Sequence, residues 1–202
     1  VCAGLDLTEA ADAPMAERSA HGLARLYAAI WRSPLVTLAA AHGAALGGGA
    51  GLLAACDCVV AADDLAIGFP EVRRGLVAAL VTCMLRRQCG DRALREWLLW
   101  GQTLPAPRAL SAGLVNCVAA PPEMLPTALA RAREACRGAP GAIARTKRLL
   151  DELGAGTIEA DIELALRHHL DARNSSEASE GIAAFREKRE PQWAKREMQP
   201  GR

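Results

Sequence analysis

Two stretches of this 202-residue chain bring together residue types that can carry chemistry. The first is "HGAALGGGAGLLAACD" (residues 42–57), with three glycines in a row and no charged residue between its terminal His and Asp. Glycine weakens a helix or strand interior by roughly 0.5–1 kcal/mol relative to Ala. A run of three therefore indicates that something, either a ligand or a packed neighbour, comes very close to this backbone.

A glycine turn between a strand and a helix exposes free amides at the positive end of the helix dipole. Such amides bind anions, either a phosphate or a developing oxyanion. No Lys-Ser/Thr pair follows the glycines, and the G-x-G-x-x-G spacing is missing, so neither a phosphate loop nor a dinucleotide fingerprint is present. The alternative is a tight turn that only lets a helix pack closely on a strand.

The second stretch is "AIGFPEVRRGLV", in which Glu71 directly follows Pro70 at the end of an apolar run. A carboxyl group there can act as a general acid or base if its surroundings raise its pKa. The alternative is that Glu71 is a residue of a first helical turn whose negative charge is offset by Arg73 and Arg74. A further carboxylate, Asp6 in "CAGLDL", is suited to cap a helix.

The apolar pattern places these residues in an alternation of strands and helices. Strands are expected over 35–41, 58–62, 66–69 and 113–119, and helices from the glycines to residue 56, over 79–89 and over 93–100. After the double proline at 121–122 the pattern becomes helical and amphipathic, with breaks near residues 138, 154 and 175. We therefore expect an α/β core over residues 1–121 with parallel strands, and a helical region over residues 122–202 that packs on the core or on a neighbouring subunit.

Composition excludes several classes of function. The 24 Lys and Arg nearly balance the 23 Asp and Glu, which argues against a nucleic-acid partner. Seven cysteines without a Cys-x-x-Cys pair favour a reducing cytoplasm over a disulfide framework or a metal site. Residues 35–56 carry no formal charge, but their Gly and Ala content makes a membrane span unfavourable.

Other residues that attract notice are not assigned a role in binding or catalysis. His168 and His169 are adjacent and point about 100° apart on a helix, which argues against joint metal ligation. Trp97, Trp100 and Trp193 are expected to pack in amphipathic helices or at interfaces. Arg145, Lys147 and Arg148 are expected to form a solvated helix face rather than a phosphate site.

Taken together in order, "VCAGLDL", "PLVTLAAAHGAALGGGAGLLAACDCVVAADD", "AIGFPEVRRGLV", "ALSAGLVNCV" and "NSSEASEGIAAFREKREPQW" resemble the crotonase superfamily of enoyl-CoA hydratases and isomerases. The likeness is nearest to bacterial enoyl-CoA or methylglutaconyl-CoA hydratase-like members. It implies a crotonase-like ββα spiral core followed by a C-terminal helical region for oligomerisation and for covering the active site. Members carry N-terminal strands before "CAG", and these strands have no counterpart here.

The resemblance assigns roles to single positions. The thioester oxygen would be held by the backbone amides of Leu5 and Gly48, and the backbone near Ala3 would contact the adenine. Glu71 matches one family acid, whereas the second acid of two-carboxylate hydratases falls on Gly51. Glu71, Gly48 and Leu5 are thus the expected catalytic residues, and Ala3, Leu5 and Gly48 the expected substrate-binding residues, with no metal ligand.

The implied activity is hydration or isomerisation of an enoyl-CoA, with CoA as part of the substrate and no further cofactor. Because Gly51 removes one acid, the choice between these two reactions stays open. Thioester hydrolysis or decarboxylation, or a non-catalytic assembly or RNA-binding subunit, remain as alternatives. The resemblance also implies a homotrimer or homohexamer without membrane attachment. An apolar stripe at spacings of four on the C-terminal helices is expected to need cover from a partner subunit: Ile158, Ile162, Leu166 and Leu170. The segment "GLVAALV" after Glu71 predicts a bulky, apolar wall for the acyl pocket.

Overall fold

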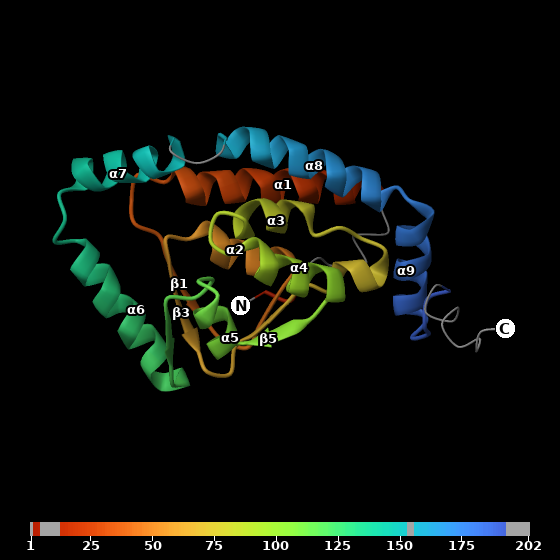
Figure 1. Cartoon of the computed structure of the whole chain (residues 1–202), viewed down its shortest axis with the longest axis horizontal. Helices are drawn as coiled ribbons and strands as arrows, with labels where there is room; N and C mark the ends of the chain where they lie inside the picture. The colour runs from red at the N-terminus through yellow and green to blue at the C-terminus, as the bar shows by residue number, and fades with distance from the viewer. Residues whose placement is uncertain (1, 5–12, 153–155, 193–202) are drawn as a thin grey trace.

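Two small sheets form the centre of the computed structural model, which describes residues 2–4, 13–152 and 156–192 (Figure 1). One sheet has the order β1-β3-β6 and is wholly parallel, and the other has the order β2-β4-β5. In the second sheet β2 pairs with β4 in parallel, whereas β5 runs antiparallel to β4. The strands are β1 (Leu38–Ala41), β2 (Ala44–Leu46), β3 (Cys58–Ala62), β4 (Ala66–Gly68), β5 (Thr103–Pro105) and β6 (Cys117–Ala119).

The chain repeats one pattern as it passes through these sheets. A strand of the first sheet is followed by a strand of the second sheet and then by a helix: β1, β2 and α2 (Gly48–Ala55), then β3, β4 and α3 (Ala79–Leu85). A 3-10 helix, η2 (Pro70–Arg74), stands between β4 and α3. This repetition confirms the ββα spiral expected for residues before the double proline, and the antiparallel β5 is the exception to the parallel pairing.

Small side chains allow the layers of the core to approach closely. Few large side chains are needed to fill the space between the strands and α2. Alanines with almost no exposure occupy much of it: Ala41, Ala45, Ala50, Ala54, Ala55, Ala61 and Ala62. The largest buried side chain, Trp97 of α4 (Asp91–Trp100), stacks on Phe69 with ring centroids 6.1 Å apart. Two further helices complete this part of the chain, α1 (Ala13–Arg32) and α5 (Ala106–Ser111).

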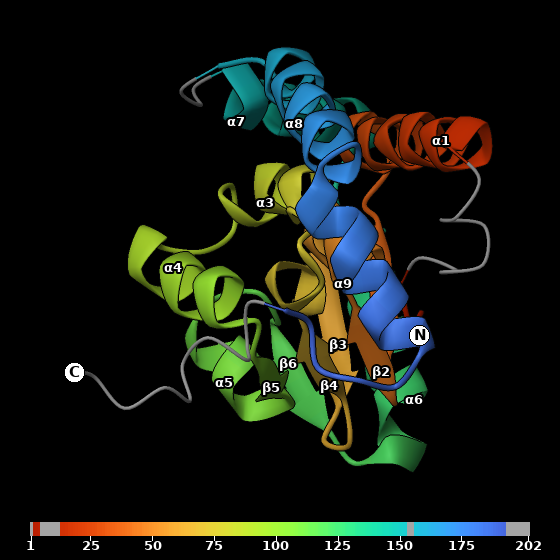
Figure 2. The ribbon, with the colours of Figure 1, turned by 90° about the vertical axis from the view of Figure 1, so that its right-hand side faces the viewer.

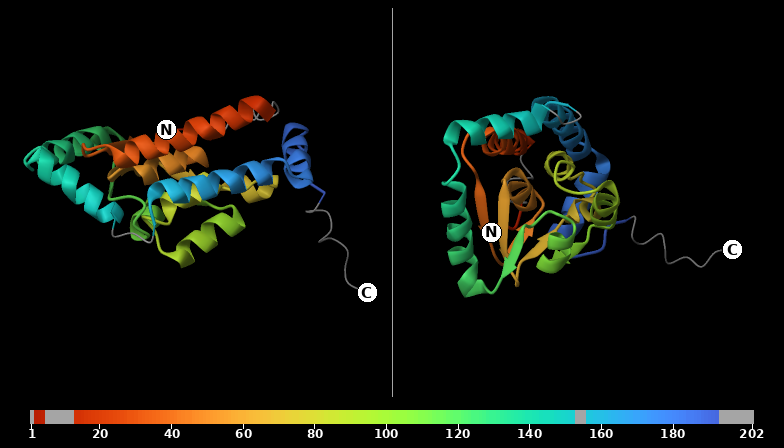
Figure 3. Two further views of the ribbon diagram at one scale, coloured as in Figure 1. Left: turned by 90° about the horizontal axis from the view of Figure 1, so that it is seen from above. Right: turned by 60° about the vertical axis from the view of Figure 1, so that its left-hand side comes forward.

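The C-terminal part that the structure describes is helical, as the sequence pattern predicts. Its helices are α6 (Pro121–Ala135), α7 (Pro140–Glu152), α8 (Ile158–Arg173) and α9 (Ser176–Arg186). Helix α6 packs against β1 and β3 of the first sheet, and α8 runs beside α1 and over α3 (Figures 1 and 3). The side chains of Thr157 and Ser175 cap the N-termini of α8 and α9.

The apolar stripe of α8 does not face solvent. Ile158 is fully buried, and Ile162, Leu166 and Leu170 pack against the core of the same chain. The expectation that this stripe needs a partner subunit is therefore wrong, because α1 and α3 already cover it. Along the described residues no helix is both long and apolar enough to cross a membrane.

Candidate active site

A cavity of about 410 Å³ lies where distant segments of the chain meet. It is lined by residues 2–4, the glycine turn before α2, Glu71 of η2, one face of α1, residues 76–81 and the end of α8. Its volume is in the usual range for small-molecule sites, and most of its wall is apolar. Helix α9 packs against η2 and so supports the segment that carries Glu71 (Figure 2).

Each glycine of the turn has a different neighbour. Gly47 adopts φ 50°, and a Cβ atom added there would lie 2.5 Å from Oε1 of Glu71. A Cβ atom on Gly49 would collide with the carbonyl oxygen of Cys2, and one on Gly51 would collide with the hydroxyl of Tyr27. The glycines therefore bring the backbone close to Glu71, to the N-terminal segment and to α1 at once, so close packing accounts for much of this run.

The N-terminal segment is held beside the glycine turn by backbone pairing. The amide of Cys2 donates to the carbonyl of Ala44, and the amide of Leu46 donates to the carbonyl of Cys2, each at 3.0 Å. This bridge extends the sheet next to β2 and brings Ala3 and Gly4 to the cavity wall. The predicted substrate-binding residue Ala3 thus lies in the same cavity as Gly48.

Gly48 is the first residue of α2 and lines the cavity. The amide of a first helical residue has no acceptor within its own helix, and the helix dipole makes that end of α2 positive. The amide of the preceding residue, Gly47, is already bonded to the carbonyl of Gly68 at 2.8 Å. Gly48 therefore presents the cavity with a backbone amide that is suited to donate to an anion. Leu5, the expected second donor, lies outside the described residues.

The structure gives a physical reason why Gly51 carries no acid. The ring of Tyr27 from α1 is fully buried, and its hydroxyl group occupies the space into which a side chain at Gly51 would project. That hydroxyl donates a 2.8 Å hydrogen bond to the carbonyl of Gly48. Where the family pattern has a second carboxylate, this chain has a tyrosine hydroxyl that supports the glycine turn.

Glu71 is the carboxylate of the cavity. Its Oε2 is buried and has no hydrogen-bond partner. Burial raises the pKa of Glu71, while a backbone hydrogen bond and the positive charge of Arg74 act in the opposite direction. A cavity-lining carboxyl group with a raised pKa and one oxygen without a hydrogen-bond partner is suited to take up and return a proton.

The apolar wall is the one predicted from the segment after Glu71. Residues 76–81 line the cavity with Leu76, Val77, Leu80 and Val81 among them. Helix α1 adds Leu23, and α2 adds Leu52. The wall between α1, α2 and this segment is therefore apolar and suits an apolar ligand.

Several cavity residues were missed by sequence reasoning. Arg74, His169 and Arg173 line the cavity, and the sequence argument about His169 addressed only metal ligation. Tyr27 supports the site from beneath, and its place as the single tyrosine in the chain was the one available signal. Their roles depend on how α1 and α8 pack on the core, which no local motif records.

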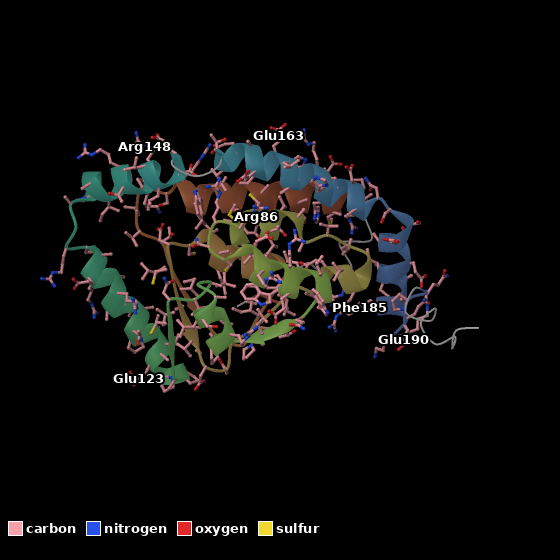
Figure 4. All side chains as sticks on the ribbon, in the orientation of Figure 1. Arg86, Glu123, Arg148, Glu163, Phe185 and Glu190 are labelled. Atoms are coloured by element: carbon pink, nitrogen blue, oxygen red, sulfur yellow. The ribbon has the colours of Figure 1, made fainter. Side chains whose placement is uncertain are left out.

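The other residues to which the sequence analysis gave no functional role lie away from the cavity or outside the described residues. The expectation of a solvated face is wrong for Lys147, which donates to the carbonyl of Leu35 and forms an ion pair with Asp57 at 2.6 Å. Lys147 thereby ties α7 to the segments that precede β1 and β3. Arg148 is exposed and points away from the body of the molecule (Figure 4). Among the described residues no cluster of three His, Cys, Asp or Glu side chains could hold a metal ion. Trp193 lies outside the described residues.

Comparison with known proteins identifies the family of this chain. The family model for enoyl-CoA hydratase/isomerase matches residues 1–196. The chain belongs to the enoyl-CoA hydratase/isomerase family. This makes it an acyl-CoA-processing enzyme with the crotonase fold, and nothing in the comparisons favours the assembly or RNA-binding alternative.

Individual relatives agree with this family assignment. A Thermus thermophilus protein assigned as an enoyl-CoA hydratase is 39% identical over 176 residues, which cover 87% of this chain and 70% of that protein. A carnitinyl-CoA dehydratase of Salmonella arizonae is 32% identical over 198 residues, covering 95% of this chain and 76% of the relative. The crystal structure of an enoyl-CoA hydratase from Mycobacterium avium superposes with a TM-score of 0.85 at 31% identity, covering 95% of this chain and 74% of that one.

Proposed function

We propose that this family member adds water to the double bond of an enoyl-CoA thioester, with Glu71 as both base and acid. The observation that carries the proposal is the carboxyl group of Glu71, which lines the cavity beside Gly48 and has one buried oxygen without a partner. Relatives whose names describe hydratases support hydration as the reaction.

The proposed reaction uses the groups around the cavity in turn. The amide of Gly48, with the amide of Leu5 that the family resemblance implies, donates to the thioester oxygen, and the backbone near Ala3 contacts the adenine. The Glu71 carboxylate takes a proton from water as the water oxygen bonds to Cβ, and the electron pair of the double bond moves toward the thioester oxygen. The enolate then takes the same proton from Glu71 at Cα. The net change is the addition of one water molecule, and CoA enters with the substrate, so no further cofactor is needed.

Isomerisation is the second candidate, and one observation favours it. Among the described residues that line the cavity, Glu71 is the only carboxylate. A single carboxylate suffices to move a proton between Cγ and Cα of an enoyl thioester, whereas two-acid hydratases use a second group to orient the water.

A panel of enoyl-CoA thioesters, followed by absorbance and mass, tests the proposal. A product heavier by one water shows hydration, and an unchanged mass with a shifted double bond shows isomerisation. In either case Glu71→Gln should lower kcat by about 10²–10⁴-fold while acyl-CoA still binds. Glu163→Gln, on the exposed outer face of α8 (Figure 4), is the matched control and should retain wild-type kinetics. Wild-type turnover by Glu71→Gln would overturn the mechanism.

We further propose a homotrimer or homohexamer located in the cytoplasm. Exposed leucines on the outer helices support a subunit contact: Leu125 and Leu129 of α6 and Leu149 and Leu150 of α7. All seven cysteines are free, as expected in a reducing compartment. Light scattering at micromolar concentration tests the assembly, and a monomer mass would refute it.

A further inference from the structure

The end of α8 brings a positive charge into the cavity that Glu71 lines. His169 and Arg173 stand one helical turn apart on α8, and both line the cavity. Burial and the charge of Arg173 lower the pKa of His169, although a hydrogen bond with the Val77 backbone acts in the opposite direction. His169 is therefore neutral near pH 7, and Arg173 is the charged group at this end of the cavity.

Arg173 has no partner for its charge among the described residues. Its Nη1 atom is buried without a hydrogen bond, and no described carboxylate forms an ion pair with it. Burial lowers the pKa of Arg173, and no neighbouring charge opposes this effect. Arg173 is half-buried, and a polar atom that is shielded from water without a partner is costly, so the buried Nη1 atom favours a bound acceptor at this place.

Arg87 is a second arginine of low exposure, and its charge is paired within the chain. Its guanidinium forms ion pairs with Asp151 and Asp161 at 3.1 and 2.8 Å. It also lies over the ring of Trp31, 5.3 Å from the centroid. Arg173 has none of these contacts with the described residues, so among them its charge has no partner and is available to a bound group.

Glu71 is not that missing partner. The cation that acts on the pKa of Glu71 is Arg74, whose guanidinium also lies over the ring of Phe185 at 4.6 Å. Arg173 is not among the groups that act on Glu71. At one place in the cavity the positive charge of Arg74 acts on the carboxyl group of Glu71. Arg173 on α8 is a separate cation of the same cavity.

We propose that Arg173 binds a carboxylate at the far end of the acyl group, so that the preferred substrate is an enoyl-CoA whose apolar acyl chain ends in an acid. This inference rests on the proposed function and specifies its substrate class. The leucine and valine side chains of residues 76–81 provide the apolar wall for the middle of such a chain. The planar guanidinium is suited to hold a carboxylate through two parallel hydrogen bonds.

The kinetic test compares two enoyl-CoA thioesters of equal chain length, one ending in a carboxylate and one in a methyl group. The wild-type enzyme should prefer the acid in kcat/KM, and Arg173→Gln should reduce that preference by about 10- to 100-fold, mainly through KM. Arg173→Lys should restore part of the preference. Arg167→Gln, an exposed position on the same helix, should leave it unchanged. A thioester ending in a quaternary ammonium should be the poorest of the set.

A binding measurement keeps this inference separate from the reaction chemistry. The Glu71→Gln enzyme should bind the acid-ended thioester more tightly than the methyl-ended one in calorimetry, and the added change Arg173→Gln should remove the difference. Equal affinity for the two thioesters, or a preference that survives Arg173→Gln, overturns the inference. Turnover of the methyl-ended thioester without any preference for the acid would preserve the proposed function and refute only the role of Arg173.

Discussion

The hydroxyl group of Tyr27 on α1 donates a 2.8 Å hydrogen bond to the carbonyl oxygen of Gly48, the first residue of α2. Burial, together with the negative charge of Glu71, raises the pKa of Tyr27, so this hydroxyl remains a donor at every working pH. One aromatic ring therefore fixes the peptide that follows the proposed oxyanion donor. The same ring fills the space next to Gly51.

Tyr27→Phe tests this support with little change in volume. Loss of the hydrogen bond should lower the free energy of unfolding by about 1 kcal/mol, measured by urea denaturation. If the bond positions the Gly48 amide for the transition state, kcat should fall while KM changes little. An unchanged kcat alongside the loss of stability would make Tyr27 a purely structural residue.

Gly51→Ala should destabilise the enzyme, although Ala is the better helix former. The added Cβ atom meets the Tyr27 ring, and overpacking of this kind costs about 1–3 kcal/mol. Gly22→Ala in α1 is the matched control, because among the described residues no atom beyond its chain neighbours and the local backbone of α1 lies within 4 Å of the new Cβ atom, and it should stabilise by up to about 1 kcal/mol. Urea denaturation of both variants checks the direction of each change in the free energy of unfolding. A Gly51→Ala variant as stable as the wild type would contradict the close contact between Gly51 and Tyr27.

Gly48→Val should impair catalysis more than folding. A Cβ atom at Gly48 faces the flexible end of Leu23, which can move, and both residues line the cavity. The valine methyl groups would then occupy space beside the thioester oxygen, so turnover should be lost while circular dichroism stays near wild type. Gly49→Ala is the contrasting variant, because its Cβ atom meets the Cys2 carbonyl, and it should lose stability. Full activity of Gly48→Val would leave the glycine run with a packing role alone.

The acid limb of the pH–rate profile should reflect the titration of the Glu71 carboxyl group. Burial raises its pKa and Arg74 lowers it, so Arg74→Gln should move the acid limb of kcat/KM to higher pH. Arg73→Gln should not move it, because Arg73 donates to the Trp100 carbonyl and does not line the cavity. A limb that stays in place in Arg74→Gln would remove Glu71 as the titrating group.

The raised pKa of Glu71 also makes a prediction about stability. The folded enzyme holds the proton of Glu71 more tightly than the unfolded chain, so this group favours folding below its ordinary pKa of 4.5 and loses that contribution as pH rises through the raised value. Glu71→Gln has no such loss. Its stability relative to wild type should therefore be greater at pH 8 than at pH 4, as urea denaturation at the two pH values would show.

Local sequence patterns predicted those helices and strands whose structure depends mainly on residues close together in the sequence. The strands at 58–62 and 66–69 and the helix after the glycines follow from apolar runs bounded by turn residues, and the structure places β3, β4 and α2 there. The expected strand at 113–119 shortens to β6 (Cys117–Ala119), because the residues before it belong to the turn after α5.

Short strands and tertiary contacts were beyond sequence reasoning. β2 and β5 have three residues each and exist because β4 pairs with both of them, which no local periodicity reveals. The residue types alone indicated Glu71 and the glycine turn as candidates, whereas Ala3 and the choice of Gly48 within the turn came from the resemblance. Tyr27 and Arg173 emerge only once α1 and α8 are packed on the core.

The pairing of Cys2 with β2 has a consequence for dynamics. Two backbone hydrogen bonds of 3.0 Å attach residues 2–4 to β2, and breaking them would open the wall formed by Ala3 and Gly4 without disturbing the pairing of β2 with β4. Small openings of this kind cost less than global unfolding and are visible in amide hydrogen exchange. A thioester that bridges the two segments binds only the closed form and so suppresses the opening. The Leu46 amide, which donates to Cys2, therefore becomes a site-specific reporter whose exchange slows as the cavity fills, while amides within β3 exchange at an unchanged rate.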